Sequence, residues 1–149
     1  MSIEKIIQTT LQNSAEVSSL LTGGIYTMQD TGRTGLTFTS TPQAFNGPSI
    51  LPCAMVKERH RYFNQQIRDQ GAQVASFHQA VEIRLYQDNG LDVIQEALKA
   101  IYKVLHDKRI DNTMFTIVAV RQGRWAEELN GAIEIVIDVD AQGLEKPGE

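Results

Sequence analysis

The chain has few of the residues that cross-link a protein or anchor it in a membrane. Cys53 is its only cysteine, so an internal disulfide cannot form, which argues against a small disulfide-stapled secreted domain. No apolar run approaches the roughly 20 residues that a bilayer-spanning helix needs. Residues 1–5 do not show the basic start of a signal peptide. We therefore expect synthesis in the cytoplasm and no membrane partner.

The sequence also lacks the patterns on which catalysis and cofactor binding depend. Its histidines, His60, His78 and His106, have no recognised ligand spacing, and surface positions explain them equally well. Cys53 has no CxxC partner, which favours a buried, unreactive thiol. No glycine pair follows a strand and opens a helix in a dinucleotide or Walker pattern. We expect no enzyme activity, no catalytic or metal-ligating residues and no cofactor.

The acidic residues near the end of the chain do not indicate an acid–base pair. Such a pair needs two carboxylates that converge across a cleft and differ in pKa. Glu134, Asp138 and Asp140 instead share the polar side of one alternating run. We expect that side to be solvated or to face a partner.

The overall composition is that of an ordinary globular domain with a small acidic excess. Of the 149 residues, 42% are hydrophobic and 21% are charged. A domain of this size buries roughly two-thirds of its unfolded surface. The formal net charge of −4 argues against nucleic-acid binding by bulk charge. We expect a single domain over residues 1–140 and a flexible, polar tail over 141–149.

The second half of the chain shows clear periodicity. Residues 77–85, 113–122 and 132–140 alternate between apolar and polar side chains, which predicts three half-buried strands. Residues 90–107 carry apolar side chains at helical spacing. Asp92 near the start of that run and Lys103 near its end suit the helix dipole.

The first residues predict a helix that stops at a glycine pair. Residues 3–21 carry an apolar stripe at helical spacing. Asn13 and Ser14 interrupt this stripe, so two shorter helices are an alternative. Gly23 and Gly24 end the run, because glycine adopts the left-handed backbone that closes a helix at little cost.

Weaker signals follow between this helix and the patterned half. Residues 25–27 suggest a short strand, and 28–49 predict a long loop of the kind that is usually functional or disordered. Residues 50–58 predict a strand, with Pro52 indicating an edge position or a late start. Residues 59–73 predict a second irregular, polar stretch.

The predicted order of elements is α-β-β-α-β-β. A sheet with one apolar face needs a cover, and two amphipathic helices can supply it. We therefore predict an α+β fold, a two-layer sandwich in which two helices cover a mostly antiparallel sheet of about four strands.

Residues 57–68 combine basic and aromatic side chains. With His neutral, their net charge is 4 − 1 = +3. Such a stretch can follow a phosphate backbone and stack on bases. We favour an exposed hairpin whose charges pair with neighbouring subunits. Trp125, near Arg121 and Arg124, is either core filler or an interface anchor.

Several features between residues 3 and 140 occur together in one known family. They are a helix running into Gly23-Gly24-Ile25-Tyr26, a strand start at Ile50-Leu51-Pro52, the strand Val81-Glu82-Ile83-Arg84-Leu85-Tyr86, a helix from Leu91 to Leu105, and Arg124-Trp125 before the last strand. In this combination the chain resembles the tail-terminator (tail-completion) proteins of long-tailed bacteriophages and gene-transfer particles. Residues 28–49 and 59–73 depart from the commonest pattern of that family.

The resemblance implies a structural subunit of the virion tail or neck, assembled in the host cytoplasm. It implies a homo-oligomeric ring, typically a hexamer, that caps the tail-tube protein, ends its polymerisation and presents a joining surface to a head-side connector or stopper protein. Rings use head-to-tail contacts between two different patches. Edge strands, loops and hairpins can supply such patches.

On this resemblance, the candidate residues for contacts with other subunits or the tube are Arg33, Phe38, Phe45, Arg59, Arg61, Tyr62, Phe63, Arg68, Arg124 and Trp125. The candidates for facing genomic DNA in a channel are Lys57, Arg59, Arg61 and Arg68. The alternatives are a head-completion or neck adaptor protein, and a nucleic-acid-binding module that uses the 57–68 hairpin. A small enzyme ranks last, because no nucleophile–base–orienter set is visible.

Overall fold

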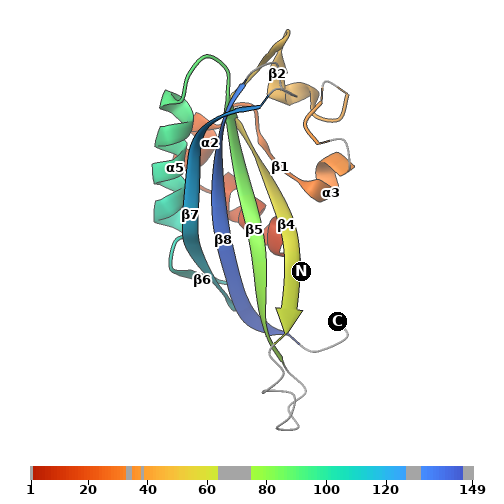
Figure 1. The fold of residues 1–149 in the computed structure, drawn as a ribbon, viewed down its shortest axis with the longest axis vertical. Helices are drawn as coiled ribbons and strands as arrows, with labels where there is room; N and C mark the ends of the chain where they lie inside the picture. The colour runs from red at the N-terminus through yellow and green to blue at the C-terminus, as the bar shows by residue number, and fades with distance from the viewer. Residues whose placement is uncertain (1, 33–34, 38, 64–74, 127–131, 146–149) are drawn as a thin grey trace.

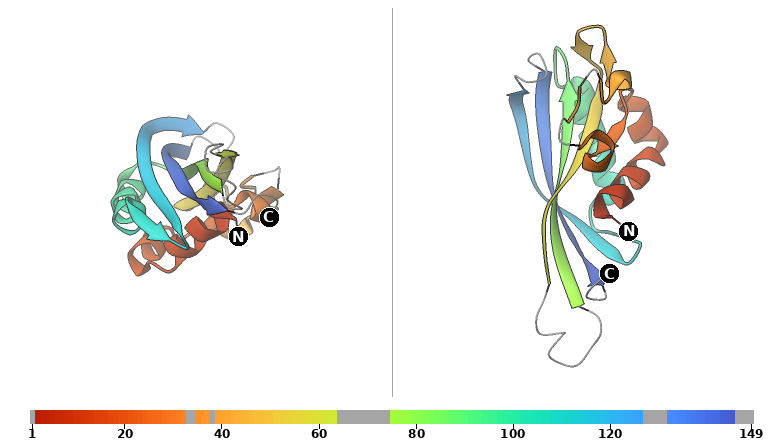
Figure 2. Two further views of the ribbon diagram at one scale, coloured as in Figure 1. Left: turned by 90° about the horizontal axis from the view of Figure 1, so that it is seen from below. Right: turned by 90° about the vertical axis from the view of Figure 1, so that its right-hand side faces the viewer.

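A strongly twisted sheet forms one layer of the molecule, and helices cover one of its faces (Figure 1, Figure 2). The computed structural model describes residues 2–32, 35–37, 39–63, 75–126 and 132–145. Within the strands, the side chains of residues 60–63, 75–76, 123–126 and 144–145 lie outside the description. We call the helix-covered face of the sheet the inner face and the opposite one the outer face.

The main sheet has six strands within the described residues. In spatial order they are β1 (Ile25–Thr27), β4 (Cys53–Phe63), β5 (Ala75–Gln87), β8 (Ala132–Glu145), β7 (Thr113–Ala126) and β6 (Lys108–Ile110). All neighbours pair antiparallel except β1 and β4, which are parallel. The long β5 and β8 lie at the centre of the sheet, and β1 and β6 are short strands at its two sides.

Four α-helices occur in the described residues: α1 (Ile3–Gln12), α2 (Ala15–Leu20), α3 (Met28–Thr31) and α5 (Asp92–Leu105). A 3₁₀ helix, η2 (Pro42–Ala44), leads into a two-stranded hairpin of β2 (Phe45–Asn46) and β3 (Ser49–Ile50). None of these described helices is long and apolar enough to span a bilayer.

The main core lies between the inner face and α1, α2 and α5. The side chains of Ile7, Ile83, Ile101 and Ile137 come from two helices and two strands, and all are fully buried there. Burying such a side chain contributes about 1.5–3 kcal/mol. The apolar residues whose spacing predicted these strands and helices are therefore the residues that form this core.

The break predicted near Asn13 and Ser14 is confirmed. The Ser2 hydroxyl accepts a hydrogen bond from the backbone N–H of Lys5 at 3.3 Å and caps α1. The Ser14 hydroxyl accepts one from the N–H of Val17 at 3.3 Å and caps α2. Each serine satisfies a backbone donor that a helix start leaves without a partner.

The glycine pair joins α2 to the sheet by close backbone contact. The Gly23 N–H donates to the Pro52 carbonyl at 2.8 Å, and the Ala54 N–H donates to the Gly24 carbonyl at 3.0 Å. A Cβ on Gly23 would lie 3.1 Å from the Cβ of Cys53, and Gly24 has φ +102°. Side chains at these two positions would therefore clash or strain the backbone.

The fold class is α+β with a mostly antiparallel sheet, as predicted, but the expected number of about four strands is wrong. The sheet has six strands because 25–27 and 108–110 add short strands at its sides. Pro52 delays the start of β4 to Cys53, which was one of the two predicted effects of this proline.

Three predicted irregular stretches are partly regular. Residues 28–49 contain α3, η2, β2 and the start of β3. In the second stretch, β4 continues through 59–63, while 64–73 lie outside the described residues. Residues 141–145, expected to begin the tail, continue β8, while 146–149 lie outside the described residues. For β4 and β8, long-range pairing with β5 produces this order, and a local pattern does not report it.

Candidate interface on the outer face of the sheet

The upper end of the outer face is covered by the chain's own segment 28–50. Leu36, Ala44 and Ile50 pack there against Met55 and Tyr86 of the sheet in a second, smaller core. This segment lies at the top right of Figure 1, beside the start of β4. The predicted loop therefore has a packing role within its own subunit.

Below that cover, charged side chains from four adjacent strands form one network. On β5, Ile83 and its alternate neighbours face the inner core, so Glu82 and Arg84 face outward. Arg59 of β4 and Arg121 of β7 approach from either side. The network thus runs across β4, β5, β8 and β7.

Glu82 is the centre of this network. Its Oε2 accepts hydrogen bonds from Arg59 Nη1 at 2.6 Å and from Arg121 Nη2 at 3.3 Å. Its Oε1 accepts from Arg84 Nε at 3.2 Å and Nη2 at 2.9 Å. Arg121 Nη2 also donates to Asp138 Oδ1 at 3.1 Å. One carboxylate is therefore held by three guanidinium groups.

The Glu82 side chain is only 2% exposed, yet it is held in its charged form. Burial by itself would raise the pKa of the carboxyl. Hydrogen bonds from Arg84 and Arg59, together with the charges of both, outweigh burial and hold the pKa of Glu82 below its usual range. Glu82 in turn raises the pKa of Arg84, although burial of Arg84 opposes this.

Arg84 also faces a second buried carboxylate. Its Nη1 lies 3.5 Å from Glu134 Oε2, and the Glu134 side chain is 1% exposed. Burial and the adjacent Glu134 raise the pKa of Tyr86, which pairs with Glu134 across the two strands. The expectation of a side that is solvated or faces a partner is therefore wrong for Glu134, because Arg84 and Tyr86 cover it. Asp138 and Asp140, the other acids of that side, are partly exposed.

The two arginines at the sides of the network are exposed on the surface. The Arg59 and Arg121 side chains are 53% and 55% exposed, and they cover the buried Glu82. Arg59 lines one shallow hollow with Lys57 and Glu82, and a second with Val118 and Asp138. Arginine held in place beside an exposed apolar side chain is typical of the residues that dominate protein interfaces.

Over the side chains that the structure describes, the charge of this surface is nearly balanced. The cations that join the network or line the hollows are Lys57, Arg59, Arg84 and Arg121, and the acids are Glu58, Glu82, Glu134, Asp138 and Asp140. With His78 neutral the sum is 4 − 5 = −1. A surface that binds a phosphate backbone needs a clear excess of cations. The described side chains of this face show no such excess, and those of Arg61 and Arg124 lie outside the description.

The structure describes only some of the candidate residues. Arg33, Phe38 and Arg68 lie outside the described residues, as do the side chains of Arg61, Tyr62, Phe63, Arg124 and Trp125. Phe45 packs against the second core of its own chain, and Lys57 is half-buried at the hollow. Arg59 is the described candidate that combines exposure with a defined partner.

Glu82, Arg84 and Arg121 were not among the candidate residues that the sequence indicated. Each is an outward position of an alternating strand, which by itself indicates only a solvated side chain. The signal that could have found them is opposite charge at outward positions of several long strands. Using it requires the strand order, which the sequence alone does not supply.

Cys53 and the described histidines have structural surroundings. Cys53 is fully buried in the second core, and burial raises the pKa of its thiol to about 12, as expected for an unreactive cysteine. His106 Nδ1 accepts the Ile117 N–H at 3.0 Å, and His78 lies 3.4 Å from Asp140. Over the described part of the chain, no three His, Cys, Asp or Glu side chains gather as a metal site would require.

No protein-family model and no curated protein sequence matches this chain. Among solved structures, it is similar to a chain from the virion of a native gene transfer agent particle. The TM-score is 0.60 at 11% identity, and the alignment covers 97% of this chain and 96% of the other. A structure from Akkermansia muciniphila, determined without its transmembrane region, aligns with a TM-score of only 0.31 at 12% identity, over 98% of this chain and 86% of the other.

This chain therefore shares its fold, over nearly its whole length, with a component of a gene transfer agent virion. At 11% identity the likeness concerns the fold alone. The likeness agrees with the resemblance to proteins of gene-transfer particles at the level of the fold, and it concerns a virion component in general rather than the tail-terminator family in particular.

Proposed function

We propose that this chain is a structural virion protein of the tail-terminator type. It forms a ring on the end of a tail tube, stops tube polymerisation and presents a joining surface to a head-side connector or stopper. The observation that carries the proposal is the full-length fold likeness to a chain of a gene transfer agent virion. It agrees with the family resemblance drawn from the sequence, which used different information.

The outer face supports a role in assembly. It combines a buried carboxylate, two half-exposed arginines that the carboxylate orients, and the exposed Val118. Because Glu82 already orients Arg59 and Arg121, less side-chain freedom is lost when a partner docks. Mixed charge then favours a specific partner by complementarity.

A head-completion or neck adaptor protein is the second candidate, because the fold likeness to a virion chain supports it equally. The two roles differ in position along the particle. Electron microscopy of intact particles that carry a labelled chain distinguishes them: density between the tube and the connector supports the terminator, and density inside the connector supports the adaptor.

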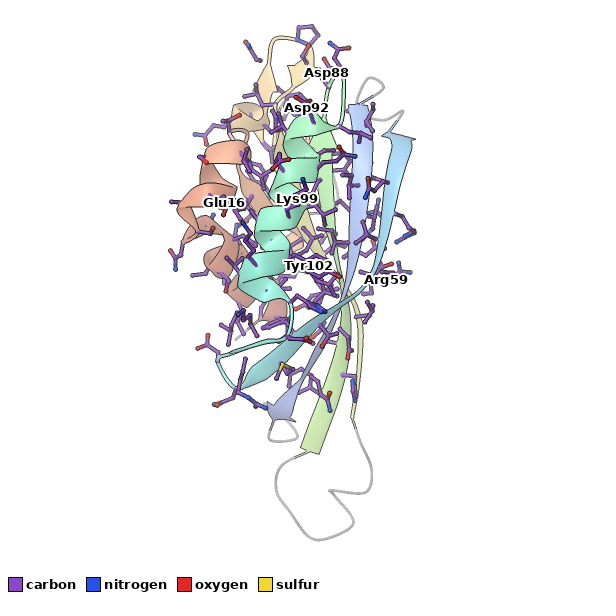
Figure 3. All side chains as sticks on the ribbon, turned by 90° about the vertical axis from the view of Figure 1, so that its left-hand side faces the viewer. Glu16, Arg59, Asp88, Asp92, Lys99 and Tyr102 are labelled. Carbon is purple, nitrogen blue, oxygen red and sulfur yellow. The ribbon has the colours of Figure 1, made fainter. Side chains whose placement is uncertain are left out.

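Tube capping in solution tests the proposed role directly. Tail-tube protein is polymerised with and without the purified chain, and tube lengths are measured by electron microscopy. We expect shorter tubes, each with the chain at one end only. Arg59→Ala should weaken capping, whereas Lys99→Ala should not, because Lys99 is on α5 on the other side of the sheet (Figure 3). Unchanged tube lengths with the wild-type chain would contradict the role.

A further inference from the structure

The main sheet is only partly covered along its two sides. β1 pairs with β4 at Ala54–Val56, and β6 pairs with β7 at Thr113–Phe115. The next backbone donors are also bound: the Glu58 N–H to the Glu4 carboxylate and the Ile117 N–H to His106. Beyond these points, no strand among the described residues pairs with the side of β4 that points away from β5 over 59–63. The same holds for the side of β7 that points away from β8 over 118–126. We call these stretches the β4 edge and the β7 edge.

The two edges run in opposite directions. Three antiparallel steps lead from β4 through β5 and β8 to β7, so β4 and β7 are antiparallel to each other. If two copies stand side by side in the same orientation, the β7 edge of one faces the β4 edge of the next in antiparallel sense. That contact would continue the sheet and keep the helices of both copies on one side.

The β7 edge has some of the devices that keep edges apart and lacks others. Proteins usually protect an open edge with charged side chains (lysine above all), proline, β-bulges or a short strand. The β7 edge carries Arg121 and Arg124, and its pairing with β8 shifts register between Ile117 and Ala119 and between Arg121 and Arg124. β7 has 14 residues, TMFTIVAVRQGRWA, without proline, lysine or an acidic residue. Val118, 61% exposed, sits where the pairing with β8 shifts register between Ile117 and Ala119. An exposed valine on an open edge favours a covered position.

Among the described side chains, the two charges at the edges do not oppose their approach. Arg59 at the β4 edge is paired with Glu82, and Arg121 at the β7 edge is paired with Glu82 and Asp138. Both guanidiniums are therefore neutralised within their own subunit. Backbone hydrogen bonds, rather than ion pairs, would supply the contact.

We propose that the β7 edge of one copy pairs antiparallel with the β4 edge of the next copy, so that the subunit ring is held by a sheet that continues across subunits. This deepens the proposed function and rests on it for the ring. The contact is head-to-tail, which is the kind that closes rings.

The positions of the edges also constrain the ring. The paired residues Glu58, Val81, Val139 and Ile117 form one row across the four long strands. The β4 edge lies between this row and one end of the strands, and the β7 edge lies between the row and the opposite end. Pairing them requires a shift along the strands from each copy to the next. In a closed ring such a shift means that the strands are tilted to the ring axis, as in closed barrels.

Cysteine cross-linking tests this contact, because the native Cys53 is fully buried and does not compete. Arg61→Cys and Ala119→Cys are prepared separately and as a double variant, and each is treated with a short bismaleimide. We expect a ladder of cross-linked species in the double variant and cross-linked dimers in a mixture of the two single variants. Either single variant alone should give no cross-linked species. Lys99→Cys on the exposed side of α5 is the matched control.

Each other outcome overturns the edge pairing. Ala119→Cys that cross-links to itself and stops at a dimer shows a two-fold contact instead. Cross-linking no stronger than in Lys99→Cys shows that the edges do not meet, whether the protein is an oligomer or a monomer by light scattering. The proposed function is tested separately by tube length, so the two can fail independently.

Salt and proline supply a second test. Association through backbone pairs should persist at about 1 M salt, where the screening length is only about 3 Å. Val120→Pro should weaken association. Val120 shares the inward side of β7 with Ile117, whose N–H points away from β8, so proline there removes a donor of the open edge. Native circular dichroism and a protected Cys53 show that the variant is folded. Association that disappears in salt, or that a folded Val120→Pro variant retains in full, contradicts the proposal.

Discussion

Glu4 and Glu58 exchange hydrogen bonds across 54 positions of the sequence. The Glu58 N–H donates to Glu4 Oε2 at 2.9 Å, and the Glu4 N–H donates to Glu58 Oε1 at 3.2 Å. The other oxygen of Glu4 accepts the N–H of Met28 at 3.0 Å. One nearly buried carboxylate, 8% exposed as a residue, therefore joins α1, the side of β4 and the start of α3.

Removing this carboxylate should destabilise the fold. Glu4→Ala leaves two backbone donors without an acceptor, which should lower the free energy of unfolding by roughly 2 kcal/mol. Urea denaturation of the two proteins measures the difference. The control is Glu96→Gln, whose side chain is 60% exposed and which should change stability by no more than about 0.5 kcal/mol. Equal effects of the two substitutions would contradict the role of Glu4.

Arg84 should matter more for stability than Arg121, although both bind Glu82. Arg84 is 24% exposed and faces two buried carboxylates, so Arg84→Ala should cost roughly 3 kcal/mol. Arg121 is 55% exposed, and Arg121→Ala should cost no more than about 1 kcal/mol. Thermal and urea unfolding of both variants check the order. A larger loss for Arg121→Ala would show that the network is organised differently.

The network should make stability depend on pH in the acid range. The pKa of Glu82 is lower in the folded protein than in the unfolded chain, where it is about 4.3. The stabilisation is therefore complete above the unfolded pKa and is lost as pH falls through the folded pKa. The stability difference between wild type and Glu82→Gln should shrink as pH falls below about 4.3. A difference that stays constant down to pH 3, measured by urea unfolding, would contradict this linkage.

Cys53 should be unreactive while the protein is folded. It is fully buried, and burial raises the pKa of its thiol to about 12, so little thiolate exists at neutral pH. A thiol reagent should modify it only after unfolding in urea. Ala119→Cys, at an exposed position of β7, should react at once in the native state. Rapid modification of native wild-type protein would contradict the described second core.

The sequence predicted those elements whose side chains alternate between core and solvent. Ile83 and Leu85 on β5, and Ile94 and Ile101 on α5, are fully buried at the spacing from which both elements were predicted. Pro52 correctly indicated a late strand start. These signals are local, so they can be read without knowing which strands pair.

The missed regions depend on contacts that are distant in sequence. Arg59 lies in a charged run of β4, and its side chain finds its partner, Glu82, on β5, so the run looked irregular. Gly143 suggested a tail, yet it lies in β8, where a Cβ would come within 2.9 Å of the Phe77 ring. That glycine marks close packing rather than a chain end. The Glu82 network likewise could not be predicted without the strand order.

Tail length in particles that lack this chain tests the central claim most directly. The gene is deleted from the phage or particle that encodes it, and tails are measured by electron microscopy with and without the wild-type chain supplied in trans. The account predicts tails of uncontrolled length that are not joined to heads, with normal length restored by the supplied chain. Tails of normal, uniform length joined to heads in the absence of the chain would contradict it.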